Sequence, residues 1–315
     1  MPSISSKTAI LERFNEVITL DTLRRCISEE ELIQLIRNYV NMEYAVIPDK
    51  DRVGKGSVYI AKIVGKPLSS LLSELKHLDV FAFADKLIDL GDQEKDRHLY
   101  NIGLAVFSYH MSSSILNLSK GFEILRLYAD HPNWEVREMA TYGIRESVKA
   151  YPKETLAILR GWIHDENDNV RRIASESLRP LSDMKWLRDQ KQNDPVLDLL
   201  SVLKADPSEY VRKSVGNNLK DLTKYMPVKI LNLLEQWFRE EKVMVTFDLA
   251  SKTKEDFTYN HPYLEHHYYL VWTAKHALRW LRERNPEFHE RIEKILGLNY
   301  VLYFDEKKNK LAKPE

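Results

Sequence analysis

The sequence is poor in the features typical of secreted, membrane-spanning and β-rich proteins. It has one cysteine, Cys26, so an intramolecular disulfide is excluded. No stretch approaches the roughly 20 apolar residues of a membrane span. The N-terminus has no apolar core before a cleavage site, so we expect no secretory signal and a cytoplasmic protein. Only 10 glycines and 12 prolines occur in 315 residues, too few for the turns of a β-sandwich.

An excess of charge of one sign is also absent. The chain has 47 basic and 47 acidic residues, and its formal net charge is zero. A basic excess supplies most of the non-specific affinity of proteins for nucleic acids, so this balance argues mildly against a nucleic-acid-binding protein. It does not exclude one, because a neutral chain can place its charges on separate faces.

Motifs for metals and nucleotide cofactors are missing as well. The sequence has no Gly-rich phosphate loop and no His-Glu-x-x-His zinc pattern. His261, His266 and His267 are close in sequence, but their spacing fits no metal site. We expect no metal, no cofactor, and a buried structural role for Cys26.

Helical patterns occupy most of the chain. Ser28 and Glu31 form a capping-box pattern at the start of one predicted helix. Residues 43–67 are interrupted by Gly and Pro and include the strand-forming Val58-Tyr59-Ile60, so a loop or small hairpin is expected there. We divide the chain into a helical region (1–120), a repeat region (121–300) with an inserted loop (241–266), and a charged tail (301–315).

A Val-Arg step recurs at Val136-Arg137, Val170-Arg171 and Val211-Arg212. The arginines are 34 and 41 residues apart, which is the length of a two-helix repeat. One helix pair cannot cover its own apolar face, so neighbouring pairs must stack. The Asp and Asn residues before each step are good helix N-caps. The pattern predicts an all-α fold, a right-handed solenoid of HEAT-like two-helix repeats.

Equivalent positions of stacked repeats lie side by side, so the residue after each Val-Arg step belongs to a row. The row holds Glu138, Arg172 and Lys213, and a looser fourth copy of the repeat adds Trp272. Trp134 shares a helix face with Glu138, where an aromatic ring beside a carboxylate can hold a planar cation. The alternatives are a solvated, salt-bridged face for the row and a core or helix-start position for Trp134.

The third repeat contains two consecutive asparagines, Asn217 and Asn218, followed by Asp221. Asparagine is a poor residue for the interior of a helix, so a hydrogen-bonding role is expected for the pair. Asn217 and Asp221 are four residues apart and share a helix face. Bridging between repeats and ligand binding are both open as the reason.

Several of these segments resemble the DNA alkylation repair family, the HEAT-like-repeat alkylpurine DNA glycosylases, and most of all its AlkC-like branch. The resemblance covers about residues 125–295. It implies hydrolysis of the N-glycosidic bond of cationic alkylated bases, such as 3-methyladenine or 7-methylguanine, in double-stranded DNA by a cofactor-free monomer. The segments are Trp134-Glu-Val-Arg-Glu138, Val170-Arg-Arg-Ile-Ala-Ser-Glu-Ser-Leu-Arg-Pro180, Val211-Arg-Lys-Ser-Val-Gly-Asn-Asn-Leu-Lys-Asp221 and Lys275-His276-Ala-Leu-Arg279.

The resemblance implies that Glu138 is the active-site acid and Asp221 a second catalytic carboxylate. A carboxylate near the sugar stabilises an oxocarbenium-like transition state and orients water. Aromatic rings favour the cationic base, and basic side chains hold the flanking phosphates. The expected aromatic contacts are Trp134, Trp186 and Trp272. The expected contacts to the DNA backbone are Arg137, Arg171, Arg172, Arg179, Arg212, Lys213, Asn217, Asn218, Lys275 and Arg279.

The chain departs from the AlkC-like pattern in three places. Residues 181–185 follow Pro180, so Trp186 takes the place of the usual aromatic through a longer turn. Gly216 replaces the usual Ala, and Lys220 replaces an Asn. These departures and the neutral charge support an alternative function, a non-catalytic HEAT-like-repeat protein that binds DNA structures or a protein partner.

Overall fold

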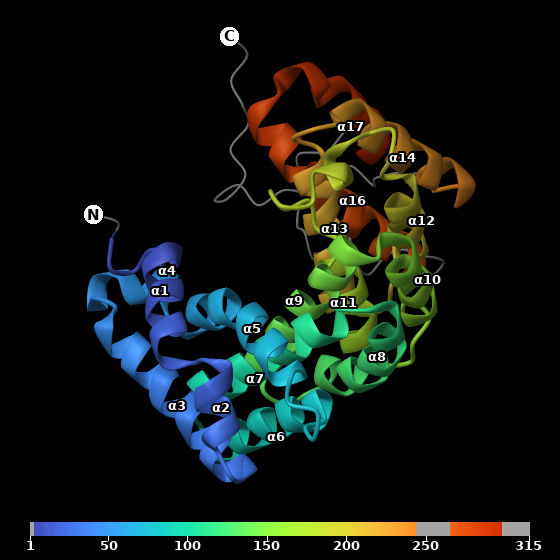
Figure 1. Ribbon diagram of the computed structural model, residues 1–315. Helices are drawn as coiled ribbons and strands as arrows, with labels where there is room; N and C mark the ends of the chain where they lie inside the picture. The colour runs from blue at the N-terminus through green and yellow to red at the C-terminus, as the bar shows by residue number, and fades with distance from the viewer. Residues whose placement is uncertain (1–2, 244–264, 298–315) are drawn as a thin grey trace. The chain divides into compact units, whose positions relative to one another are not determined.

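The computed structural model describes residues 3–243 and 265–297, and their regular secondary structure is entirely helical (Figure 1). This confirms the predicted all-α class. The chain divides into two compact units, Met1–Thr155 (unit 1) and Leu156–Glu315 (unit 2). None of the described helices has the length and hydropathy needed to cross a membrane.

Unit 1 is built around α7, which packs against α5, α6, α8 and α9. Because α7 has neighbours on several sides, its residues from Leu99 to Ser108 are all buried. The helices of unit 1 are α1 (Lys7–Val17), α2 (Leu20–Arg25), α3 (Glu29–Val46), η1 (Asp49–Asp51), α4 (Arg52–Lys55), α5 (Ser57–Ser73), α6 (Val80–Gln93), α7 (Arg97–Met111), α8 (Ile115–Ala129) and α9 (Trp134–Ala150).

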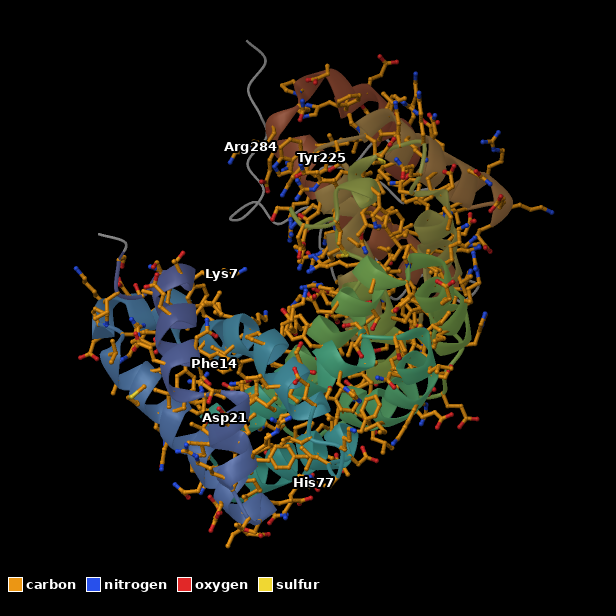
Figure 2. All side chains as sticks on the ribbon, viewed as in Figure 1. Lys7, Phe14, Asp21, His77, Tyr225 and Arg284 are labelled. Atoms are coloured by element: carbon orange, nitrogen blue, oxygen red, sulfur yellow. The ribbon has the colours of Figure 1, made fainter. Side chains whose placement is uncertain are left out.

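Close helix contacts and aromatic packing form the core of unit 1. Gly65 of α5 lies directly against α7, since a Cβ at that position would stand 2.6 Å from the Cβ of Ala105. Phe14 of α1 meets Tyr39 of α3 edge to face, with ring centroids 5.5 Å apart. Figure 2 shows Phe14 among the side chains of these helices, whereas Lys7 of the same helix is exposed. The amphipathic pattern of α1 therefore directs one face into the core.

The predicted loop or hairpin at residues 43–67 is wrong. α3 continues to Val46, a short turn of helix follows, and Val58-Tyr59-Ile60 lies at the start of the 17-residue helix α5. Ile60 and Val64 are four residues apart and fully buried, which is the helical period. Burial against α7 therefore overrides the strand preference of these side chains. Pro67 lies inside α5 even though it provides no backbone N–H.

Unit 2 contains the second and third Val-Arg repeats. In it α11 packs on α13, α13 packs on α16, and α14 contacts both α16 and α17. Most of the predicted insert (241–266) and all of the tail (301–315) lie outside the described residues. The helices are α10 (Pro152–Trp162), which begins in unit 1, α11 (Asp168–Glu176), η2 (Lys185–Arg188), α12 (Asp194–Val202), α13 (Glu209–Leu222), α14 (Pro227–Glu240), α16 (Glu265–Arg284), η3 (Pro286–Phe288) and α17 (His289–Leu296).

The division between the compact units lies after Thr155, inside α10. The sequence placed a boundary at residue 120, which lies within α8. α9, the helix of the first Val-Arg repeat, therefore belongs to the compact unit that also contains α5 and α7. Glu138 of α9 therefore shares a compact unit with the side chains of α5 and α7.

The arginine of each Val-Arg step holds the loop that precedes its own helix, while the valine is buried. In all three repeats Nη1 donates to the carbonyls six and five residues earlier, at 2.6–3.0 Å. The acceptors are His131 and Pro132 for Arg137, Asp165 and Glu166 for Arg171, and Asp206 and Pro207 for Arg212. We call this arrangement the arginine clamp.

Side chains of the same loops cap the start of α9 and of α11. Asn133 and Asn167 accept backbone N–H groups of α9 and α11, which confirms the predicted N-caps of the first two repeats. In the third repeat the N-cap of α13 is Ser208, which makes no side-chain cap hydrogen bond, so the predicted Asp or Asn cap is wrong there. Arg171 also makes two bonds to Asp206 of the next repeat, at 2.7 and 2.9 Å. Arg137, Arg171 and Arg212 are therefore each bonded through Nη1 to the protein's own backbone, and their contact with phosphate stays a prediction.

Candidate functional site

Glu138 lies on an exposed part of α9, one turn after Trp134 and one turn before Tyr142. Trp134 is the first residue of the helix and is 64% exposed, so the alternative of a core residue is wrong. The two side chains share a helix face, as the spacing of four residues predicts. A carboxylate and an indole are thus both presented to solvent in unit 1.

A cluster of Lys62, Tyr109 and Tyr142 lies beside Glu138. Lys62 of α5 places its Nζ 4.6 Å from the ring centroid of Tyr142, in a cation–π contact. The hydroxyl of Tyr142 is hydrogen-bonded to that of Tyr109, which also donates to the carbonyl of Lys62 at 3.2 Å. The cluster therefore joins α5, α7 and α9.

The ammonium of Lys62 is less favoured than that of an exposed lysine. Burial lowers the pKa of Lys62, and the positive charges of Arg145 and Lys149 act in the same direction. The negative charges of Glu138 and Glu146 oppose this shift but do not reverse it. Lys62 and Glu138 thus interact electrostatically.

Asp221, the second predicted carboxylate, lies on α13 and is surrounded by cations. Arg179 donates to its Oδ2 at 3.1 and 2.5 Å, and Lys224 donates to its Oδ1 at 3.1 Å. Lys220 stands 3.5 Å from the same carboxylate. Burial acts to raise the pKa of Asp221, but the bonds from Arg179 and Lys224 outweigh it and the pKa is lowered. Asp221 is therefore firmly held in its ionised form.

Arg179 and Asn218 link neighbouring repeats in unit 2. Arg179 donates to Glu176 of its own repeat at 3.0 Å as well as to Asp221 of the next. Asn218 is fully buried and donates to the carbonyl of Ser175 at 3.0 Å. Of the two open explanations for the asparagine pair, repeat bridging is the one that Asn218 fulfils. The DNA contact predicted for Asn218 is corrected, because its side chain is inaccessible.

Asn217 and Trp272 meet at His276, a residue of α16. The rings of Trp272 and His276 are stacked, with centroids 5.1 Å apart and an interplanar angle of 3°. Nε2 of His276 is 3.0 Å from Oδ1 of Asn217 on α13. A Cβ at Gly216 would lie 2.8 Å from the Cβ of His276. The glycine that departs from the family pattern therefore leaves room for this histidine.

Cations surround the stacked pair. Burial and the charges of four neighbours lower the pKa of His276 to about 3, and those neighbours are Arg279, Lys220, Lys213 and Lys275. Arg212, only 4% exposed, lies over the ring of Tyr269 at 3.9 Å and over Trp272 at 5.4 Å. Three residues predicted to bind the DNA backbone therefore lie near one another on α13 and α16. They are Lys213, Lys275 and Arg279.

The remaining predicted residues lie elsewhere in unit 2. Arg172 stacks over the ring of Tyr210, with its Cζ 4.8 Å from the centroid. Trp186 is half-buried in the short helix η2. The segment before it is packed rather than looped out, since Met184 is buried and Arg188 donates to the carbonyl of Pro180 at 3.0 Å. Residues 181–185, which depart from the AlkC-like sequence pattern, are therefore held in a defined local structure.

Sequence reasoning missed Lys62, Tyr142 and the stacking role of His276. Helical spacing could have predicted Tyr142 and His276. Each lies four residues after a predicted site residue, Glu138 or Trp272. Lys62 was hidden by the wrong interpretation of residues 43–67. Its place beside α9 depends on the contact between α5 and α7, for which the sequence carries no local signal.

Known proteins similar to this chain include one curated relative and solved structures. The Bacillus subtilis (strain 168) protein YhaZ, described as uncharacterized, is 29% identical over 150 residues, which are 46% of this chain and 34% of that relative. The chain thus matches about a third of the length of this relative.

Two solved structures show similarities below a TM-score of 0.5. AlkD2 from Streptococcus mutans has a TM-score of 0.49 at 21% identity, and the match covers 80% of this chain and 99% of that one. The alkylpurine DNA glycosylase AlkC of Pseudomonas fluorescens, bound to DNA containing an abasic site analog, has a TM-score of 0.49 at 22% identity. That match covers 94% of this chain and 68% of the AlkC chain.

The match to a protein family covers more of the chain than the match to YhaZ does. The model of the DNA alkylation repair enzyme family matches residues 69–281, which include α6 to α14 and most of α16. All three Val-Arg repeats, Glu138 and Asp221 lie inside this region. The chain therefore belongs to the DNA alkylation repair enzyme family.

Proposed function

We propose that this protein is a DNA glycosylase that removes cationic alkylated bases, of the 3-methyladenine or 7-methylguanine type, from double-stranded DNA. The observation that carries the proposal is the exposed carboxylate of Glu138 in a member of the DNA alkylation repair family. Trp134 is exposed on the same face of the helix. Glu138 is thus accessible to a DNA sugar.

The proposed chemistry requires little of the protein. An alkylated purine already carries a positive charge and is a good leaving group, so the sugar becomes cationic as the N-glycosidic bond breaks. The carboxylate of Glu138 stabilises that charge and accepts a proton from the attacking water. No metal or organic cofactor enters this scheme.

The lesion and the duplex would be bound by the aromatic and basic residues. Trp134 is the most exposed of the three predicted aromatics, since Trp186 and Trp272 are half-buried. Lys213, Lys275 and Arg279, with Arg172 and Asn217, are the proposed contacts to the DNA backbone. Asp221 is proposed as the second carboxylate, acting chiefly through its hold on Arg179 and Lys220.

Base release from methylated duplex DNA tests the proposal. The full-length protein is incubated with the DNA in the presence of EDTA, and released bases are quantified by mass spectrometry. We expect release of 3-methyladenine or 7-methylguanine above the spontaneous rate. Salt-sensitive binding of duplex without release of any base contradicts this function and supports the non-catalytic alternative. An absence of DNA binding at low salt supports a protein-binding role instead.

A further inference from the structure

Lys62 has the surroundings of a nucleophilic lysine. It lies in the first half of α5, is half-buried, and packs its amine against the ring of Tyr142. Among the residues that the structure describes, it forms no ion pair. A lysine partly removed from water and not bound to a carboxylate retains a reactive amine, as in enzymes that form imines with carbonyl substrates.

The same lysine lines a cavity of about 350 Å³ at the start of α5. Arg52, Arg97, Tyr44 and Tyr59 contribute to its walls. Arg52 bonds to Asp49 and to the carbonyls of Ala45 and Ile47, and Arg97 bonds to Glu135, so these groups would attract a phosphodiester chain through their positive charge rather than through free donors. A nucleotide held there would present its sugar near the amine of Lys62.

The electrostatic environment adds an acid–base partner. Glu138 interacts with Lys62 and lies one turn before Tyr142 on α9. Burial lowers the pKa of Lys62, which increases the fraction of unprotonated amine at neutral pH. A nucleophilic amine and a carboxylate that can move protons are therefore neighbours in unit 1.

We propose that Lys62 attacks the aldehyde of an abasic deoxyribose and forms an imine with it, so that the protein is also a DNA lyase at abasic sites. This activity rests on the proposed function, because the abasic sugar is the product of base excision. It deepens that function by assigning a second reaction to the product before its release.

The reaction balances without an external oxidant or reductant. The amine of Lys62 adds to C1′ of the ring-opened sugar, and the carbinolamine loses water to give a protonated imine. Glu138 removes a proton from C2′, and the electron pair expels the 3′ phosphate as the C3′–O bond breaks. Water then hydrolyses the imine, which releases Lys62 and an unsaturated aldehyde on the DNA end.

Reductive trapping on preformed abasic DNA tests the proposal. The full-length protein is incubated with an abasic duplex, made by enzymatic removal of a single uracil, in the presence of sodium cyanoborohydride. We expect a covalent protein–DNA adduct on a denaturing gel, with the added mass on the peptide that contains Lys62. Without the reductant, we expect strand cleavage on the 3′ side of the abasic site.

The variant Lys62→Arg keeps the positive charge over Tyr142 but cannot form an imine. We expect it to lose trapping by about tenfold or more. The control Lys66→Arg alters an exposed lysine one turn further along α5 and should trap as the unmodified protein does. Circular dichroism shows whether each variant is folded.

The outcomes separate this proposal from the glycosylase function. No adduct on preformed abasic DNA, or equal trapping by Lys62→Arg, overturns the lyase activity whatever the base-release assay shows. Trapping that depends on Lys62 supports the lyase even when no methylated base is released. Because the substrate is made without the protein's own excision step, a failure of that step does not affect this test.

Discussion

Glu138 in unit 1 and Asp221 in unit 2 are both carboxylates, yet their surroundings differ in kind. Glu138 is exposed on α9, whereas Asp221, on α13, accepts hydrogen bonds from Arg179 and Lys224, which lie outside that helix. Cations lower the pKa of Asp221 and so make it a weaker base. The comparison teaches that the cations around a carboxylate, and not the residue type, commit Asp221 to holding Arg179 and Lys224.

The largest expected effect is on catalysis at Glu138. We expect Glu138→Gln to slow base release by about 10²–10⁴-fold, because general-base and electrostatic catalysis are lost while the shape is kept. The matched variant Asp221→Asn should slow it by less than about tenfold, since Asp221 acts mainly on Arg179 and Lys220. Single-turnover base release, with duplex binding measured separately, compares the two. Equal losses in both variants would show that the carboxylates act as one unit.

The next largest effect concerns the arginine clamp. Arg171→Met removes bonds to two carbonyls and to Asp206, whose side chain is 5% exposed. Because a buried carboxylate would lose its partner, the free energy of unfolding should fall by about 3 kcal/mol. The neighbouring Arg172→Met should lower it by less than about 1 kcal/mol. Urea denaturation of both variants measures the difference, and a similar loss in each would remove the distinction between clamp and surface arginines.

The buried histidine of unit 2 makes stability depend on pH. The pKa of His276 is lowered to about 3, whereas a histidine in the unfolded chain titrates near 6.5. The unfolded chain therefore binds a proton that the folded protein does not, so stability falls as the pH drops from about 6.5 toward 3. The contribution is roughly 1.4 kcal/mol per pH unit at most, or about 2 kcal/mol between pH 6.5 and 4.5.

His276→Gln should reduce this slope, while His77→Gln, at an exposed residue of unit 1, should leave it unchanged. Denaturation curves at several pH values between 4.5 and 7 supply the measurement. An unaltered slope in His276→Gln would mean that the imidazole is already protonated, in conflict with its burial among cations.

The smallest effects compare two glycines of unit 2. Gly216→Ala places a Cβ 2.8 Å from the Cβ of His276, so it should destabilise the protein by about 1–2 kcal/mol and disturb the stack with Trp272. Gly161→Ala meets nothing within 4 Å and lies in α10, so it should stabilise by up to about 1 kcal/mol. Thermal unfolding monitored by circular dichroism gives both values. Stabilisation by Gly216→Ala would show that α13 and α16 can move apart.

The sequence predicted the repeats well because their signals are local. The buried valines, the caps at Asn133 and Asn167, and the helix starts depend on residues a few positions apart. The same holds for the all-α class, which follows from apolar spacing along each helix. Trp134 and Glu138 share a face for this reason as well.

The parts that the sequence could not supply depend on contacts between distant residues. Arg171 was predicted to bind DNA, but it bonds to Asp206, 35 residues away. The sequence leaves two roles open for Asn218, and its hydrogen bond to the carbonyl of Ser175 decides between them. The helix α5 was misread because its burial against α7 decides its structure. The sequence does not show whether a charged side chain binds a ligand or another group of the protein.

The arginine clamp binds carbonyl oxygens, which every residue has, rather than the side chains of the loop. The loop positions five residues before the arginines are therefore free to vary, and they are Pro132, Glu166 and Pro207 in the three repeats. Each of the three helices thus holds the turn that precedes it through its own arginine. Repeats of this kind can diverge on their loop surfaces, or be duplicated as a block, without the turns losing their shape.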